Sequence, residues 1–246
     1  MKLILAIILF LFFLTTANAE SKPWHISLEG GAALQTVNDV AIPSDTGTRF
    51  SLIDAVGKGP FPYYRIEATY DIKEKHRLRL LIAPLAIEKT GQLDKQVVFD
   101  GKTFAAGTNT KFRYQFNSYR LTYAYRIYQS PAWRWHMGFT AKIREAEIAL
   151  TQGNVSSSYP NLGFVPLLYV SAKHQINSQW YTQMDLDAIA SPYGRAIDLG
   201  LFALHKINDN WNIGAGYRTI EGGADNDKVY TFAWLHYVGL KLSYTK

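Results

Sequence analysis

Residues 64–72 decide the fold, and they read Tyr64-Arg65-Ile66-Glu67-Ala68-Thr69-Tyr70-Asp71-Ile72. Every second side chain is apolar or aromatic, and each side chain between them is polar or charged. Because successive side chains of an extended strand point to opposite faces, this pattern predicts a strand with one apolar and one charged face. Residues 230–244 repeat the pattern with larger aromatic side chains.

Stretches of this kind recur along the chain, and turn-forming residues separate them. We expect ten strands, at residues 24–36, 61–72, 76–88, 111–128, 132–151, 161–175, 180–190, 195–206, 211–220 and 230–244. The connections are short at residues 73–75, 129–131, 177–179 and 207–210, and long at residues 37–60, 89–110 and 152–160. Outer-membrane barrels show this asymmetry, with short periplasmic turns and long external loops. Eight or twelve strands stay open as alternatives.

The composition favours a membrane barrel over a soluble protein. The chain is 14% aromatic and 19% charged, and it is slightly polar on average. Alternating strands with one lipid face and one polar face produce this combination. The predicted fold class is therefore all-β, as a single antiparallel transmembrane β-barrel with a polar lumen. A soluble β-sandwich is the alternative, but its strands seldom carry aromatic residues at both ends.

The N-terminus has the parts of a secretory signal. Lys2 supplies a positive charge, residues 3–14 are all apolar, and Ala17-Asn18-Ala19 forms a small-residue cleavage site. The apolar run is too short to cross a bilayer as a helix. We therefore expect a signal peptide at residues 1–19, a barrel domain at residues 20–246 and localisation in the bacterial outer membrane.

Several classes of site are excluded by composition. The chain contains no cysteine, which excludes a disulfide framework, zinc–thiolate sites and cysteine nucleophiles. The net charge is +6, but the basic residues form no run or stripe, so a nucleic-acid partner is not indicated. No motif indicates a cofactor or a metal ion.

Tryptophan opens four of the predicted strands, at Trp24, Trp133, Trp180 and Trp211. An indole ring favours the bilayer interface because its body is apolar while its N–H group stays hydrated. All four strands begin on the same side of the predicted barrel. We therefore expect these tryptophans to form a periplasmic girdle.

Two predicted strands change phase along their length. The slip lies between Phe116 and Tyr119 in one strand, and between Ile143 and Ala146 in the next. A β-bulge in each strand would restore a continuous apolar face. Residues that then face the lumen include Arg113, Glu145 and Glu147. The alternative is that both strands leave the membrane at these points, where the pattern no longer matters.

The end of the chain resembles small bacterial outer-membrane β-barrel proteins. Residues 230–244 alternate and close on the aromatic Tyr244, as does the C-terminal assembly signal of that class. Residues 116–123 and 216–225 look like an uncharacterised family of such barrels. The resemblance implies contact with outer-membrane lipid, lipopolysaccharide and the assembly machinery, and it implies no activity.

The charged strand faces predict a cluster inside the lumen, made of Asp185, Asp187, Asp198, Arg120, Arg144 and Arg218. If residues 191–194 close a hairpin, Asp187 lies opposite Asp198, an arrangement that is destabilising without a cation. Arg218 is expected near Asp198. Because buried charges must pair, we prefer a structural salt-bridge network that fills the lumen. A narrow arginine-lined pore and a Ca²⁺ or Mg²⁺ site on the carboxylates are alternatives.

A barrel enzyme is the second class of function. The catalytic candidates are Asp185, Asp187 and Asp198, because an aspartate pair can activate water, as in the omptin-type proteases. Those proteases also use an Asp-His pair, and no Asp-His dipeptide occurs here. A lipid A hydrolase would need a hydroxyl group beside a histidine, and His136 and His174 lie in predicted strands with Thr140 and Ser171 nearby in the sequence.

We expect a non-enzymatic barrel, either structural or engaged in limited passive transport or surface binding of a small solute. A lipid A hydrolase or an omptin-like protease is the alternative.

Overall fold

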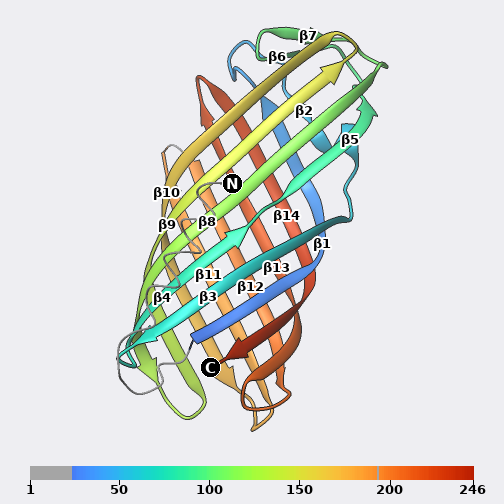
Figure 1. Ribbon diagram of the computed structural model, residues 1–246. Helices are drawn as coiled ribbons and strands as arrows, with labels where there is room; N and C mark the ends of the chain where they lie inside the picture. The colour runs from blue at the N-terminus through green and yellow to red at the C-terminus, as the bar shows by residue number, and fades with distance from the viewer. Residues whose placement is uncertain (1–23, 193) are drawn as a thin grey trace, which may run out of the picture.

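The computed structural model describes residues 24–192 and 194–246 (Figure 1). The predicted signal peptide, residues 1–19, lies outside this part of the chain. The elements are β1 (Trp24–Ala41), β2 (Phe50–Ser51), α2 (Leu52–Val56), β3 (Phe61–Ile72), β4 (His76–Ala83), β5 (Ala86–Gln92), β6 (Val97–Phe99), β7 (Lys102–Phe104), β8 (Asn109–Gln129), β9 (Trp133–Gln152), β10 (Val155–Gln175), β11 (Trp180–Ser191), β12 (Gly194–Lys206), β13 (Trp211–Asn226) and β14 (Val229–Thr245).

The sheet closes on itself as an antiparallel barrel. Each barrel strand pairs with the next along the chain, and β14 pairs with β1 from Thr245 opposite His25 to Tyr230 opposite Ala41. β4 and β5 occupy one position between β3 and β8, so the barrel has ten strands. The predicted all-β, ten-strand barrel is confirmed.

Several strand boundaries differ from the prediction: β1 runs on to Ala41 and β13 to Asn226, and two other strands differ more. The strand expected at residues 76–88 is broken at Pro84, which separates β4 from β5. Proline cannot donate a ladder hydrogen bond, and this interrupts the pairing. The long loop predicted at residues 152–160 is wrong, since β10 begins at Val155 directly after a tight turn at Gly153. Residues 155–158 are rich in serine, which is common in loops, and this composition led to the wrong prediction for an extended strand.

The predicted β-bulges near Phe116 and Ile143 are wrong. β9 pairs with β10 without interruption from Trp133 to Gln152, and the register of β8 with β9 shifts only between Arg126 and Tyr128. The alternation therefore continues, and the strands extend beyond the membrane. There the apolar side chains of Phe112 and Leu150 face inward.

An apolar plug fills part of the extracellular half of the barrel. It joins inward residues of the wall to the segments between β1 and β3 and between β5 and β8. Its members include Ile42, Phe50, Leu52, Leu93, Val97, Phe99, Phe104, Phe112, Tyr114 and Leu150. Within the segment between β1 and β3, residues 50–51 form the two-residue pairing of β2 with β1, and the short helix α2 follows.

The outer face carries an apolar belt. Phe139 is 69% exposed and Leu240 is 62% exposed, which suits contact with lipid. On β9 the outward side chains are apolar from Trp135 to Ile143, a length close to the ~10 residues that a tilted transmembrane strand needs. No helix of the described residues is long and apolar enough to cross a membrane.

Outward charges begin directly above this belt. Arg113, Glu145 and Glu147, which the bulge interpretation assigned to the lumen, face outward because the register is continuous. Trp24, Trp133, Trp180 and Trp211 are the first residues of β1, β9, β11 and β13. Their role as an interfacial girdle stays a prediction.

Candidate functional site

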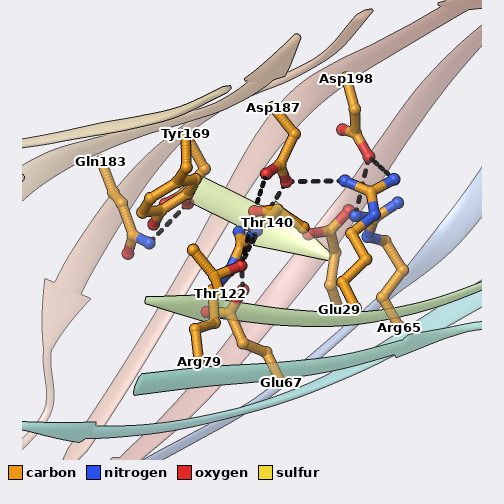
Figure 2. A network of polar contacts seen from close by, with 12 residues as sticks. Glu29, Arg65, Glu67, Arg79, Thr122, Thr140, Tyr169, Gln183, Asp187 and Asp198 are labelled. Atoms are coloured by element: carbon orange, nitrogen blue, oxygen red, sulfur yellow. Dashed lines mark hydrogen bonds and ion pairs between the residues drawn. The ribbon is translucent and has the colours of Figure 1, made fainter. Parts of the chain in front are cut away.

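A network of ion pairs crosses the lumen, and Asp198 on β12 is its centre (Figure 2). Its Oδ2 accepts a hydrogen bond from Arg65 Nη2 at 3.0 Å and lies 2.7 Å from Arg120 Nη2. Its Oδ1 accepts from Arg218 Nη1 at 2.6 Å. These arginines belong to β3, β8 and β13, so a single carboxylate links distant parts of the wall.

Asp187 on β11 lies directly opposite Asp198 in the hairpin register. Its Oδ2 accepts from Arg79 Nη2 at 2.6 Å and from Arg120 Nη1 at 2.7 Å. Its Oδ1 accepts from the Thr140 hydroxyl at 2.6 Å. Arg120 therefore bridges the two aspartates and offsets the repulsion between like charges.

Two further groups extend the network. Arg218 donates to both carboxylate oxygens of Glu29, at 2.9 and 2.8 Å, in the bidentate geometry that favours arginine. Asp185 accepts from the Tyr169 hydroxyl at 2.9 Å and from Gln183 Nε2 at 2.7 Å. The Lys241 ammonium lies 4.0 Å from Asp185.

Charges in the network balance. The cations are Arg65, Arg79, Arg120, Arg218 and Lys241, and the carboxylates are Glu29, Glu67, Asp185, Asp187 and Asp198. Space for one guanidinium depends on a glycine, because a Cβ on Gly200 would lie 2.6 Å from Arg218 Nη2. Both oxygens of Asp187 and of Asp198 are occupied by protein groups. No cluster of metal-ligating side chains occurs within residues 24–192 and 194–246.

A cavity of about 600 Å³ lies on the extracellular side of this network. Arg120, Asp187 and Asp198 line one end, and Ile148, Ile189, Ile220 and Leu235 line the walls. Residues Gly194, Arg195 and Asn226, beside the external turns, line the other end. Cavities of this size typically hold one small molecule.

Lys142 and Arg144 place two further positive charges in the cavity. The Lys142 side chain is buried, with its ammonium 4.8 Å from the centre of the Phe116 ring. Arg144 Nη2 donates to Asn161 Oδ1 at 2.5 Å, while its Nε has no hydrogen-bond partner. Neither side chain forms an ion pair with a carboxylate of the described residues. The lumen cluster predicted from the sequence is thus divided, with Arg144 in the cavity and the other members in the network.

An ionic ladder lies outside the barrel above the lipid belt. Glu88 contacts Lys111 at 3.1 Å and Arg113 at 2.5 Å, and Arg113 also contacts Glu147 at 3.0 Å. The hydrogen bonds from Lys111 and Arg113 hold the pKa of Glu88 below its usual range. These charges stay solvated, so the ladder is a poor candidate for a functional site.

His136 lies directly opposite Ser171 in the register of β9 with β10, and both are buried, but no hydrogen bond joins their side chains in the described part of the chain. The Thr140 hydroxyl is hydrogen-bonded to Asp187, and the His174 ring stacks on Trp133 at 4.2 Å between ring centres. Sequence analysis missed another arrangement on the outer face. His236 Nε2 lies 2.9 Å from the Thr36 hydroxyl, and its Nδ1 lies 2.5 Å from the Tyr217 hydroxyl.

That arrangement depends on barrel closure. Thr36 sits at the register shift between Gln35 and Val37, where β1 pairs with β14. Residues so far apart along the chain give no local signal of contact, so the sequence pattern alone could not have identified them.

The comparisons with known proteins locate the fold. No protein-family profile matches the chain, and no curated protein matches it. Among solved structures, the outer membrane protease OmpT from Escherichia coli aligns with a TM-score of 0.55 and 10% identity, over 93% of this chain and 99% of that chain. The translocator domain of the autotransporter NalP from Neisseria meningitidis aligns with a TM-score of 0.44 and 8% identity, over 99% and 95%. Ail from Yersinia pestis aligns with a TM-score of 0.42 and 11% identity, over 91% and 99%. Only the likeness to OmpT has a TM-score above 0.5, and because the two sequences are 10% identical, it concerns the fold alone.

Proposed function

We propose that this protein, a β-barrel of the bacterial outer membrane, binds a small anionic ligand in its extracellular cavity and does not conduct ions. The observation that carries the proposal is the pair Lys142 and Arg144, two basic side chains that line the cavity and form no ion pair with a carboxylate of the described residues. The carboxylates that also line it, Glu147, Asp187, Asp198 and Glu221, are paired with other arginines. A buried charge is costly unless it is paired. A carboxylate, phosphate or sulfate on the ligand would supply the missing partner.

The ion-pair network supports a closed lumen. Arg120 and Asp198 are almost completely buried, and they connect opposite parts of the wall. Separating such pairs leaves uncompensated charge in a confined space, so a spontaneous opening is unfavourable. We expect no single-channel steps from the purified protein in planar bilayers. Stable ohmic steps would contradict the closed barrel.

The binding function is tested by titrating the protein in lipid nanodiscs with hexyl phosphate in a calorimeter. Replacing both cavity cations, as Lys142→Met with Arg144→Met, should weaken binding at least tenfold, which is about 1.4 kcal/mol. A matched control removes two external cations, as Lys111→Met with Arg113→Met, and should leave affinity unchanged. Equal losses in both pairs, or no binding by the unaltered protein, would refute the proposal.

Peptide hydrolysis by Asp187 and Asp198 is less well supported. Arginines and Thr140 occupy the oxygens of these carboxylates, which leaves them poorly placed to activate water.

A second candidate is hydrolysis of an ester in an outer-leaflet lipid, favoured by the contacts among Thr36, His236 and Tyr217 on the outer face. Mass analysis of lipid A from cells carrying the protein or its His236→Asn variant tests this candidate. A lipid A change that requires His236 would support it, and identical spectra would remove it.

The partners proposed from the architecture are lipid and lipopolysaccharide around the belt, and the assembly machinery acting on β14. The lipid environment follows from the membrane barrel itself, and the small solute is the ligand proposed above.

A further inference from the structure

β10 and β11 separate before either strand ends. Their pairing runs from Gln175 opposite Tyr181 to Leu168 opposite Ala188. β10 extends further, to Val155, and in the described part of the chain no strand pairs with this edge of residues 155–167. We call the open stretch, residues 165–167 of β10 facing Ile189 and Ala190 of β11, the seam.

Two prolines explain why the edge is open. Pro160 and Pro166 have no backbone N–H group, and they are an even number of residues apart, so both missing donors fall on the same edge of β10. β9 stays paired with β10 through both positions. Because proline is tolerated where its missing donor faces no partner, the edge toward β11 is the one that lacks donors.

The seam connects the cavity with the apolar surface of the barrel. The cavity lining includes Val165, Pro166 and Leu167 on one side of the seam and Ile189 on the other. Outside it, Leu162 is 75% exposed and Phe164 is 64% exposed.

The height of the seam follows from the neighbouring strand. Leu162 lies opposite Glu145 of β9, where the outward charges begin. Residues 165–167 lie opposite Lys142 to Thr140 of β9, so the seam is at the upper end of the apolar belt, just below the level where the outward charges begin. Figure 1 shows the long strands β8, β9 and β10 rising past the ends of β11 and β12 on this side of the barrel.

Both cations of the cavity lie next to the seam. In the β9–β10 register, Lys142 is opposite Val165 and Arg144 is opposite Gly163. Gly163 leaves room for the guanidinium, since a Cβ there would lie 3.0 Å from Arg144 Nη2. The cavity walls include the apolar Ile148, Ile189, Ile220 and Leu235, while Arg120, Asp187 and Asp198 close one end. An anionic head held at the seam and an apolar tail directed inward would complement both parts.

We infer that the ligand is a single-chain anionic amphiphile that reaches the cavity sideways from the outer leaflet, through the seam. This inference rests on the proposed binding function and adds the ligand class and the route. The cavity of about 600 Å³ is within the range of sites for one small molecule. A carboxylate or phosphate head satisfies Lys142 and Arg144 by charge-assisted hydrogen bonds.

The route is tested by closing the seam. Because the chain has no native cysteine, Pro166→Cys with Ala190→Cys introduces a unique pair, which would be opposite if the ladder continued. The control pair, Leu168→Cys with Ala188→Cys, lies below the seam where the strands are already paired. One probe is parinaric acid, a fluorescent fatty acid preloaded in the vesicle membrane. The other is hexyl phosphate, added in water from outside.

Oxidation of the seam pair should slow binding of parinaric acid at least tenfold, and reduction should restore the rate. Binding of hexyl phosphate and all rates of the control pair should stay unchanged. If the disulfide does not form, Pro166→Thr, which restores a ladder donor, should also slow parinaric acid.

Parinaric acid that binds at the unaltered rate with the seam closed would overturn the lateral route and leave the proposed binding function in place. Failure of the unaltered protein to bind either probe would overturn both. If closing the seam slows the binding of parinaric acid, the ligand comes from the membrane, as inferred. Hexyl phosphate binding without any parinaric acid binding assigns it to water and overturns the inference.

Discussion

Neutralising Asp198 should destabilise the folded barrel more than any exposed charge substitution. Asp198→Asn keeps the side-chain shape and removes the charge, so the effect is electrostatic and leaves no void. In the native barrel this carboxylate contacts Arg65, Arg120 and Arg218 at 2.6 to 3.0 Å. Removing one partner of a buried ion pair costs about 3–5 kcal/mol, and we expect the upper part of that range because three arginines lose the same partner.

The assay is a reversible urea titration of the protein in lipid vesicles, followed by tryptophan fluorescence. Glu147→Gln is the matched control, since Glu147 also pairs with an arginine, at 3.0 Å, but is partly exposed above the belt. Exposed pairs contribute below about 1 kcal/mol. A loss for Asp198→Asn that is no larger than the loss for Glu147→Gln would refute the reasoning.

A second substitution checks the cause. Arg65 forms its ion pair with Asp198, so Arg65→Met removes a cation that Asp198→Asn leaves unpaired. The double variant should therefore be more stable than the sum of the two separate losses implies. Strict additivity would mean that the two side chains do not interact.

Three further predictions concern packing, the interface and pH. Gly200→Ala should lower the free energy of unfolding by about 1–3 kcal/mol, because the new Cβ displaces the Arg218 guanidinium. Gly30→Ala is the control, since the atom nearest to a Cβ there is 3.4 Å away. Equal losses for the two variants in the same urea titration would contradict the packing argument. A variant that retains Trp180 alone should be quenched most by lipids brominated near the head group, and strongest quenching from the chain ends would place Trp180 away from the interface. Glu88 has a lowered pKa, so its charge stabilises the fold at neutral pH, and that contribution is lost as the pH falls through the lowered pKa. The difference in unfolding free energy between the unaltered protein and Glu88→Gln should therefore shrink in acid. A difference that grows in acid would contradict the prediction.

Much of the barrel wall was predictable because the alternation of apolar and polar side chains within a strand shows which residues share a face. Residues 61–72 were bounded correctly by alternation, and so were the strand starts at Trp24, Trp180 and Trp211, while the strand that opens at Trp133 was predicted to begin one residue early. The opposition of Asp187 and Asp198 followed from one short hairpin. Local spacing sufficed in these cases since the partners are neighbours in sequence.

Prediction failed where the environment of a strand changes along its length. Phe112 and Leu150 appeared out of phase with the lipid face, which suggested bulges. In the folded barrel they contact an apolar plug formed by loops, so apolar side chains face inward there and charged Glu147 faces outward. Alternation reports only that two faces differ, and it does not report whether lipid, water or a plug covers each face.

The amino-acid sequence by itself determined a closed, two-faced sheet, because the period of two and the turns are properties of adjacent residues. Only the tertiary structure decided which charges meet across the lumen, which cations remain unpaired in the cavity, and where β10 leaves β11. Those features join residues from strands far apart in the chain, and their contacts arise only when β14 returns to β1 and the barrel closes.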